Sequence, residues 1–171
     1  MLEDILEYRK LGRTGLDVSE VGLGTWAFAS QAYGDVAETS SLDTIRTALD
    51  CGITLFDTAP LYGDLSRDGI SEYILCKGQG PNRNRVVIST KFGRRATQRA
   101  APDFSANCAV SSVGESLNRL GTDYIDILFF HSPFGHAEIE DDVWQALDDL
   151  RNSGKIRLWV TRSPNSRTPG E

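Results

Sequence analysis

Four short apolar runs recur along the chain at nearly equal intervals, and a segment with helical periodicity lies within each interval. The runs begin near residues 53, 85, 124 and 155, so successive starts are 32, 39 and 31 residues apart. A strand, a crossover helix and the next parallel strand together need about 30 residues. The intervals therefore predict an α/β fold, either an open doubly wound sheet or part of a (β/α)8 barrel.

The individual elements follow from the spacing of apolar residues. A period of 3.6 predicts helices over residues 39–51, 69–78, 107–120 and 139–152. Apolar runs rich in β-branched residues predict strands over residues 53–56, 85–90, 124–130 and 155–160. Residues 21–26 are apolar and punctuated by glycine, which favours a buried first strand, so we expect about five parallel strands. Residues 8–11 and 16–20 flank a glycine turn and predict a β-hairpin at the N-terminus.

The ends of the chain differ in character. Residues 1–160 are expected to form one domain, because the strand and helix pattern continues to residue 160. Residues 161–171 contain two prolines and no apolar period, which predicts an irregular or disordered tail. The first five residues lack a cationic segment followed by an apolar one, so we expect a cytoplasmic protein.

Composition excludes several other classes. Eighteen basic residues against 24 acidic ones give a net charge of −6, which argues against nucleic-acid binding. No apolar run approaches the about 20 residues of a membrane helix. The three cysteines are widely spaced and are expected to be reduced thiols. The two histidines do not form H-x-H or H-E-x-x-H, so we expect no metal.

Three ionisable side chains stand at the ends of successive predicted strands. Asp57 directly follows the second strand, Lys91 the third and His131 the fourth, and Tyr62 lies five residues after Asp57. The carboxyl ends of parallel strands meet at one edge of a sheet, where active sites are built. Taken singly, these residues also suit a turn cap, a solvated strand end and a loop hydrogen bond. Together they predict an active site.

This set of residue types suits proton transfer to a carbonyl group. A phenol has an ordinary pKa near 10, and a nearby ammonium group stabilises the phenolate. A carboxylate can hold the ammonium in place, while an imidazole orients the carbonyl oxygen. No side chain can supply a hydride, so a nicotinamide cofactor is implied.

Longer segments around these residues resemble the aldo/keto reductase family, specifically its N-terminal part. The segments are residues 8–19, Gly22-Leu-Gly-Thr-Trp26, Phe56-Asp-Thr-Ala-Pro-Leu-Tyr-Gly63, Ile88-Ser-Thr-Lys91, residues 116–126, Phe130-His-Ser132 and residues 154–157. The resemblance implies a (β/α)8 barrel that interconverts carbonyls, including those of sugars, and alcohols with NADP(H) or, less often, NAD(H). It also implies a catalytic tetrad of Asp57, Tyr62, Lys91 and His131, with Tyr62 as the acid–base group.

The same resemblance implies where the cofactor binds. Gly24, Thr25, Trp26 and Asp57 correspond to positions at the cofactor and substrate mouth. Residues 33–36 and 103–106 are most similar to a branch of sugar-dehydrogenase-like enzymes.

The chain departs from the family pattern after residue 157. A complete barrel needs about 250 residues, and the glycine expected after the fifth strand is absent from residues 158–166. These observations predict a truncated product, as from a reading-frame slip near residue 160. The later strands of the family bind most of the cofactor. The alternative to an oxidoreductase is therefore a non-catalytic fragment that self-associates through exposed strand edges.

Two local motifs point to other classes. Residues 22–27 fit the G-x-G-x-x-A dinucleotide fingerprint, but residues 28–34 resemble a loop and not a helix, so a Rossmann site is not favoured. Ser132 adjoins His131, but neighbouring side chains of an extended segment point apart and no G-x-S-x-G is present, which disfavours hydrolase chemistry.

Overall fold

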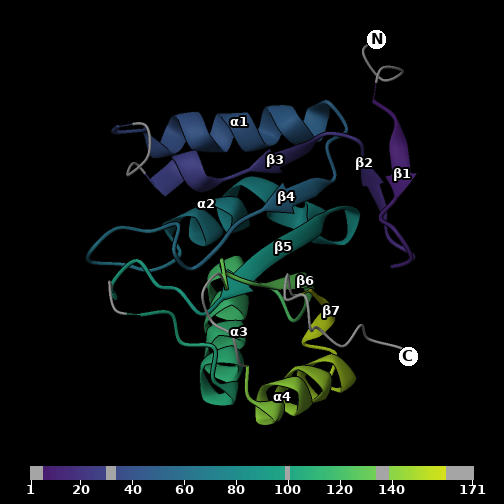
Figure 1. Ribbon diagram of the computed structural model, residues 1–171. Helices are drawn as coiled ribbons and strands as arrows, with labels where there is room; N and C mark the ends of the chain where they lie inside the picture. The colour runs from purple at the N-terminus through teal and green to yellow at the C-terminus, as the bar shows by residue number, and fades with distance from the viewer. Residues whose placement is uncertain (1–5, 30–33, 99–100, 134–138, 161–171) are drawn as a thin grey trace.

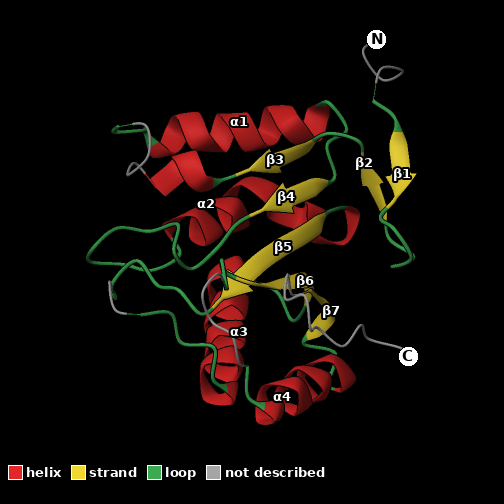
Figure 2. Cartoon of the chain, in the orientation of Figure 1, coloured by secondary structure: helices red, strands yellow, loops and turns green. Residues whose placement is uncertain are grey.

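The computed structural model describes residues 6–29, 34–98, 101–133 and 139–160. Its centre is a parallel five-stranded sheet whose strands lie side by side in chain order (Figure 2). The strands are β3 (Gly22–Gly24), β4 (Leu55–Asp57), β5 (Val87–Phe92), β6 (Ile125–Phe130) and β7 (Ile156–Val160). This arrangement confirms the predicted partial (β/α)8 barrel with about five parallel strands.

Four α-helices connect the strands and cover one face of the sheet (Figure 1). They are α1 (Glu38–Asp50), α2 (Ile70–Gln79), α3 (Ala106–Leu120) and α4 (Asp141–Asn152). Each helix packs against the next one along the chain. Helix α3 shows why these residues form helices: the Ser105 hydroxyl accepts a hydrogen bond from the Cys108 amide at its start, and Gly121 adopts a left-handed φ of 62° at its end.

Apolar side chains pack on both faces of the sheet. The outer core, between strands and helices, contains fully buried residues such as Phe56, Ile88 and Leu128. A smaller cluster on the inner face joins Val87 and Ile127 to Leu16 and Val18. The alternation of side chains along each strand accounts for these two sets.

The N-terminal hairpin supplies the inner cluster. Its strands are β1 (Tyr8–Lys10) and β2 (Asp17–Ser19), which pair antiparallel as predicted. Ser19 and Thr54 exchange two hydrogen bonds of 2.9 Å between the amide of each residue and the hydroxyl of the other. The hairpin is thereby fixed at the amino-terminal side of the sheet, opposite the predicted active-site edge (Figure 1).

The expected buried strand over residues 21–26 is partly wrong. Only Gly22–Gly24 pairs with a neighbour, and Val21 and Trp26 are 54% and 53% exposed. The physical reason is that β3 is an edge strand in the described part of the chain, and its glycines have no side chains to bury. The expected loop over residues 28–34 is also partly wrong, because a 3-10 helix, η1, spans Trp26–Ala29; residues 30–33 lie outside the described residues.

Other boundaries differ by a few residues. Lys91, expected directly after a strand, lies within β5, because pairing with β6 continues to Phe92. A second 3-10 helix, η2 (Gly80–Arg85), occupies the region before β5. The predicted tail, residues 161–171, lies outside the described residues.

Several general properties concern the described residues alone. None of the helices is long and apolar enough to cross a membrane in the part of the chain that the structure describes. Cys51, Cys76 and Cys108 are free cysteines. No cluster of three metal-binding side chains occurs within the described ranges.

Candidate active site

The carboxyl edge of the sheet brings the four predicted side chains together. Asp57 is the last residue of β4, and Lys91 is the penultimate residue of the neighbouring β5. His131 follows β6, and its amide donates a 2.9 Å hydrogen bond to the carbonyl of Phe92. Tyr62 lies in the turn after β4. Parallel pairing of β4, β5 and β6 therefore places residues that are far apart in sequence at one edge.

The ammonium group of Lys91 is the centre of the site. Its Nζ lies 2.9 and 2.8 Å from the two carboxylate oxygens of Asp57 and 2.8 Å from the carbonyl oxygen of Thr58. It also donates a hydrogen bond of 3.1 Å to the hydroxyl of Tyr62. The Lys91 side chain is only 15% exposed. Its charge is thus directed at both the phenol and the carboxylate.

His131 completes the site from β6. Its ring stands edge-on to the Tyr62 ring, with 5.9 Å between centroids and 88° between planes. The pKa of His131 is lowered to about 4, chiefly by burial and in addition by the charges of Lys91 and Arg94, while Asp57 acts in the opposite direction. The imidazole is therefore neutral at pH 7. Its Nδ1 is buried without a hydrogen-bond partner among the described residues.

The turn that carries Tyr62 is fixed by backbone hydrogen bonds. The Tyr62 amide donates to Ala59, and its carbonyl accepts from the Ser71 amide in the first turn of α2, at 3.0 and 2.9 Å. A side chain at Gly63 would collide with the Arg67 backbone carbonyl. This position therefore accepts only glycine without rearrangement of the turn. The phenol is held between β4 and the start of α2.

Two groups in the site were not predicted. The Ser89 hydroxyl donates a 2.7 Å hydrogen bond to Asp57 Oδ1, and the Thr58 carbonyl accepts from Lys91. Ser89 lies two residues before Lys91, so both side chains point to the same face of β5. That spacing is a signal that could have identified Ser89. Nothing in the sequence marks a backbone carbonyl.

The predicted cofactor residues differ in accessibility. Gly24 and Trp26 are exposed, and the Asp57 side chain is 39% exposed. Thr25 is fully buried, and both its amide and its hydroxyl donate to the Asp57 carbonyl. This geometry assigns Thr25 to holding Asp57 and does not favour a contact between its side chain and a cofactor. A mostly apolar pocket of about 320 Å³ lies between Gly24, Asp57 and the inner face of the sheet.

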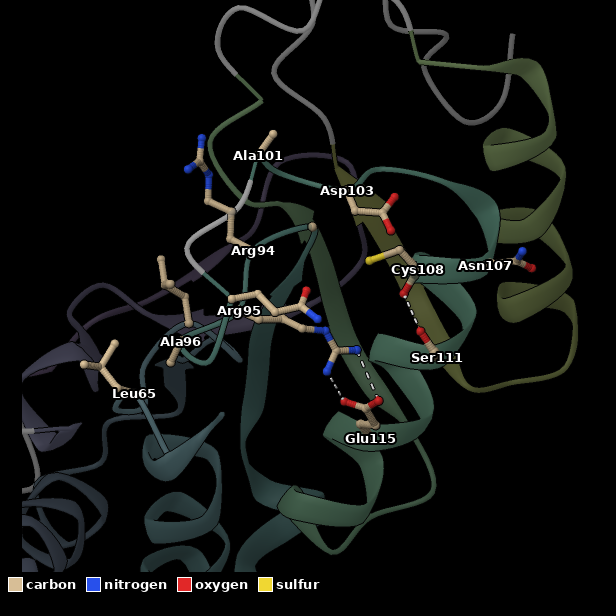
Figure 3. Close-up of a pocket in the computed structure, with 13 residues that line it drawn as sticks. Leu65, Arg94, Arg95, Ala96, Ala101, Asp103, Asn107, Cys108, Ser111 and Glu115 are labelled. Atoms are coloured by element: carbon tan, nitrogen blue, oxygen red, sulfur yellow. Dashed lines mark hydrogen bonds and ion pairs between the residues drawn. The ribbon is translucent and has the colours of Figure 1, made fainter. Parts of the chain in front are cut away.

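A larger pocket of about 790 Å³ lies beside the site, between the segment after β5 and α3 (Figure 3). Arg95 crosses it and binds Glu115 of α3 through two hydrogen bonds of 2.6 and 3.1 Å. Its lining mixes apolar residues with polar ones that include Arg94, Asp103 and Asn107.

The parallel βα sheet with this polar edge defines a partial (β/α)8 barrel, and comparison with known proteins identifies its family. The pattern of the Aldo/keto reductase family matches residues 20–167. The chain belongs to the aldo/keto reductase family, a family of oxidoreductases.

Individual relatives agree with this assignment. The chain is 39% identical over 163 residues to aldo-keto reductase YhdN of Bacillus subtilis (strain 168), a match that covers 89% of this chain and 45% of that protein. It is 41% identical over 159 residues to L-galactose dehydrogenase of Arabidopsis thaliana, covering 90% of this chain and 47% of that protein. The solved structure of aldo-keto reductase AKR11C1 from Bacillus halodurans (holo form) superposes with a TM-score of 0.74 at 27% identity. The match covers 94% of this chain and 52% of that chain. The chain spans about half the length of the relatives it matches.

Proposed function

We propose that this chain carries the proton-transfer site of an NAD(P)(H)-dependent oxidoreductase that interconverts carbonyls and alcohols. The observation that carries the proposal is the position of Lys91, whose ammonium binds the Tyr62 hydroxyl and the Asp57 carboxylate at the same time. A phenol beside a fixed positive charge can donate its proton and remain as a stabilised phenolate.

Each residue has a distinct role in this mechanism. Tyr62 gives its proton to the substrate oxygen during reduction and takes it back during oxidation. Lys91 stabilises the phenolate, and Asp57 with Ser89 holds Lys91 in position. His131, neutral at pH 7, donates a hydrogen bond from its ring N–H that orients the carbonyl oxygen.

The residues present fit a nicotinamide cofactor, which supplies the hydride when bound. The exposed indole of Trp26 and the exposed backbone of Gly24 lie at the same edge as Asp57, and flat rings pack well against such surfaces. We assign the cofactor contacts to Gly24, Trp26 and Asp57, with NADP as the expected cofactor and NAD as the alternative.

The substrate we propose is a small aldehyde, ketone or sugar. One of the relatives, at 41% identity, is an L-galactose dehydrogenase, which supports a sugar. We also propose a cytoplasmic location, in keeping with the three free cysteines.

The second candidate is a chain without catalytic activity of its own. The observation in its favour is that the chain spans 45% and 47% of its two curated relatives. Loss of a bound hydride donor would remove the proximity on which catalysis depends.

A cofactor titration separates these two candidates. Fluorescence of NADPH and of NADH is followed as purified chain is added, and turnover is then measured with a generic aldehyde and with L-galactose. Saturable binding and turnover support the oxidoreductase. Absence of binding at millimolar cofactor would favour the non-catalytic chain.

Substitution of the phenol tests the assigned acid. Tyr62→Phe is expected to lower kcat by at least about 100-fold, because general acid catalysis contributes roughly 10²–10⁴-fold, and Lys91→Met nearly as much. The matched control is Tyr73→Phe, which removes a hydroxyl from a partly exposed tyrosine of α2. Turnover of Tyr62→Phe equal to that of the control would refute the assignment.

A further inference from the structure

Two adjacent arginines after β5 make different contacts. Arg95 binds the Glu115 carboxylate, whereas Arg94 is directed away from that pair (Figure 3). Arg94 Nε donates a 3.0 Å hydrogen bond to the carbonyl of His131, and its Nη2 donates a 3.3 Å bond to the carbonyl of Ser132. Within the described ranges no carboxylate lies at ion-pair distance from Arg94.

The backbone that Arg94 holds is strained. Ser132 has a φ of 51°, and it is the one non-glycine residue with a positive φ in the part of the chain that the structure describes. Serine rarely adopts this conformation, and such residues persist only where surrounding contacts determine them. The turn at Ser132 directly follows His131, so it sets the direction in which the chain leaves β6.

We propose that Arg94 is a positioning residue. By binding the carbonyls of His131 and Ser132 it holds the left-handed turn at Ser132. This turn fixes the imidazole of His131 edge-on to the ring of Tyr62. The guanidinium fork spans two consecutive carbonyls, a geometry that the single ammonium group of a lysine cannot reproduce. The role of Arg94 in turnover rests on the proposed function, but its effect on the imidazole does not.

The charge of Arg94 has a second effect on the same ring. The groups that face His131 are Asp57 of β4, Lys91 of β5, the ring of Tyr62 and Arg94 itself. Lys91 and Arg94 both lower the pKa of the imidazole. Arg94 therefore helps to keep His131 neutral.

Nuclear magnetic resonance tests this proposal without turnover. The chain has two histidines, so His136→Gln leaves His131 as the sole imidazole to be observed. In that background we expect cross-peaks between the rings of Tyr62 and His131, and a His131 pKa of about 4. Arg94→Met is expected to weaken the cross-peaks and to raise the pKa of His131 toward its ordinary 6.5. The matched control is Arg46→Met, which removes an exposed arginine from α1.

The outcomes separate a positioning role from a purely structural one. Cross-peaks of undiminished strength in folded Arg94→Met would overturn the proposal, because the ring would then hold its place without the guanidinium. If Arg94→Met does not fold, Arg94→Lys, which keeps the charge but cannot span both carbonyls, replaces it; cross-peaks between Tyr62 and His131 as strong as in Arg46→Met would then overturn the proposal. In an active protein Arg94→Met should lower kcat with little change in KM. A negative turnover assay alone would bear on the proposed function and not on the positioning of the ring.

Discussion

At the scale of single residues, the site combines charges that are fixed with one group that is kept neutral. Lys91 and Asp57 form an ion pair at 2.8 Å, while His131, only 8% exposed, is held in its neutral form. Burial removes the hydration of a charged imidazole, and the two neighbouring cations, Lys91 and Arg94, repel its charge. The folded protein therefore opposes protonation of His131, and its stability becomes linked to pH.

The sign of this linkage follows from the two pKa values. The unfolded chain binds a proton on His131 near pH 6.5, and the folded chain binds it near pH 4. Between these values the unfolded state carries more protons, so the free energy of unfolding falls as pH falls from 6.5 to 4, by an amount on the order of 3 kcal/mol for this group. His131→Asn should lose that part of the pH dependence.

Urea unfolding at several pH values measures this effect. Carboxylates titrate in both proteins, so the difference between wild type and His131→Asn isolates the imidazole. His136→Gln serves as the control for removing a histidine. Parallel pH profiles of wild type and His131→Asn would mean that His131 is not buried in its neutral form.

The four residues of the site could be predicted from sequence, but their contacts could not. The ends of parallel strands must share an edge, so Asp57, Lys91 and His131 were expected to meet. The bond between Ser89 and Asp57, and the carbonyls bound by Arg94, depend on backbone geometry that no residue type encodes. The prediction that Trp26 is buried was likewise wrong, because the exposure of a strand depends on whether it lies at the edge of the sheet.

At the scale of elements, a buried ion pair joins α2, β5 and α3. Glu72 of α2 is fully buried; it accepts 2.6 Å bonds from Arg119 of α3 and from the hydroxyl of Thr90, the residue before Lys91. A glutamate in a helix is ordinarily expected on its exposed side. The sequence predicted the helix over residues 69–78 to within a residue, but not this buried carboxylate, because its partner is 47 residues away.

Loss of one partner from this pair should be costly. Arg119→Met leaves the Glu72 carboxylate buried without its cation, which is expected to destabilise the protein by about 3 kcal/mol. Lys77→Met breaks the 2.7 Å bond between Lys77 of α2 and Glu38 of α1. Because these two side chains are 41% and 49% exposed, the loss should cost much less than that of Arg119. Denaturant unfolding of both variants measures the difference. Equal losses of unfolding free energy in Arg119→Met and Lys77→Met would show that burial does not control the strength of these two ion pairs.

At the scale of the whole molecule, the sheet has two edges without a partner strand in the described part of the chain. Strand β3 pairs with β4 alone and β7 pairs with β6 alone. Unpaired edges present rows of amide and carbonyl groups to other chains. We propose that residues 1–160 act as one cooperative unit that self-associates through these edges.

Two exposed valines give a matched test of self-association. Val160 lies in the edge strand β7 and Val110 lies on α3, with exposed fractions of 40% and 48%. Val160→Lys should reduce the concentration-dependent rise in mass measured by light scattering during size-exclusion chromatography, because a charged edge resists pairing. Val110→Lys should leave it unchanged. A wild-type mass that stays at 18.8 kDa at all concentrations would rule the association out.

The order of the strands has a consequence for how the protein is made. Each strand of the sheet lies beside the one synthesised just before it, so no strand must wait for a distant segment. A ribosome adds about 5–20 residues per second, so a new βα unit of some 30 residues emerges roughly every 2–6 seconds. The sheet can therefore grow by one strand at a time during translation, with the newest strand always at one edge and β3 at the other.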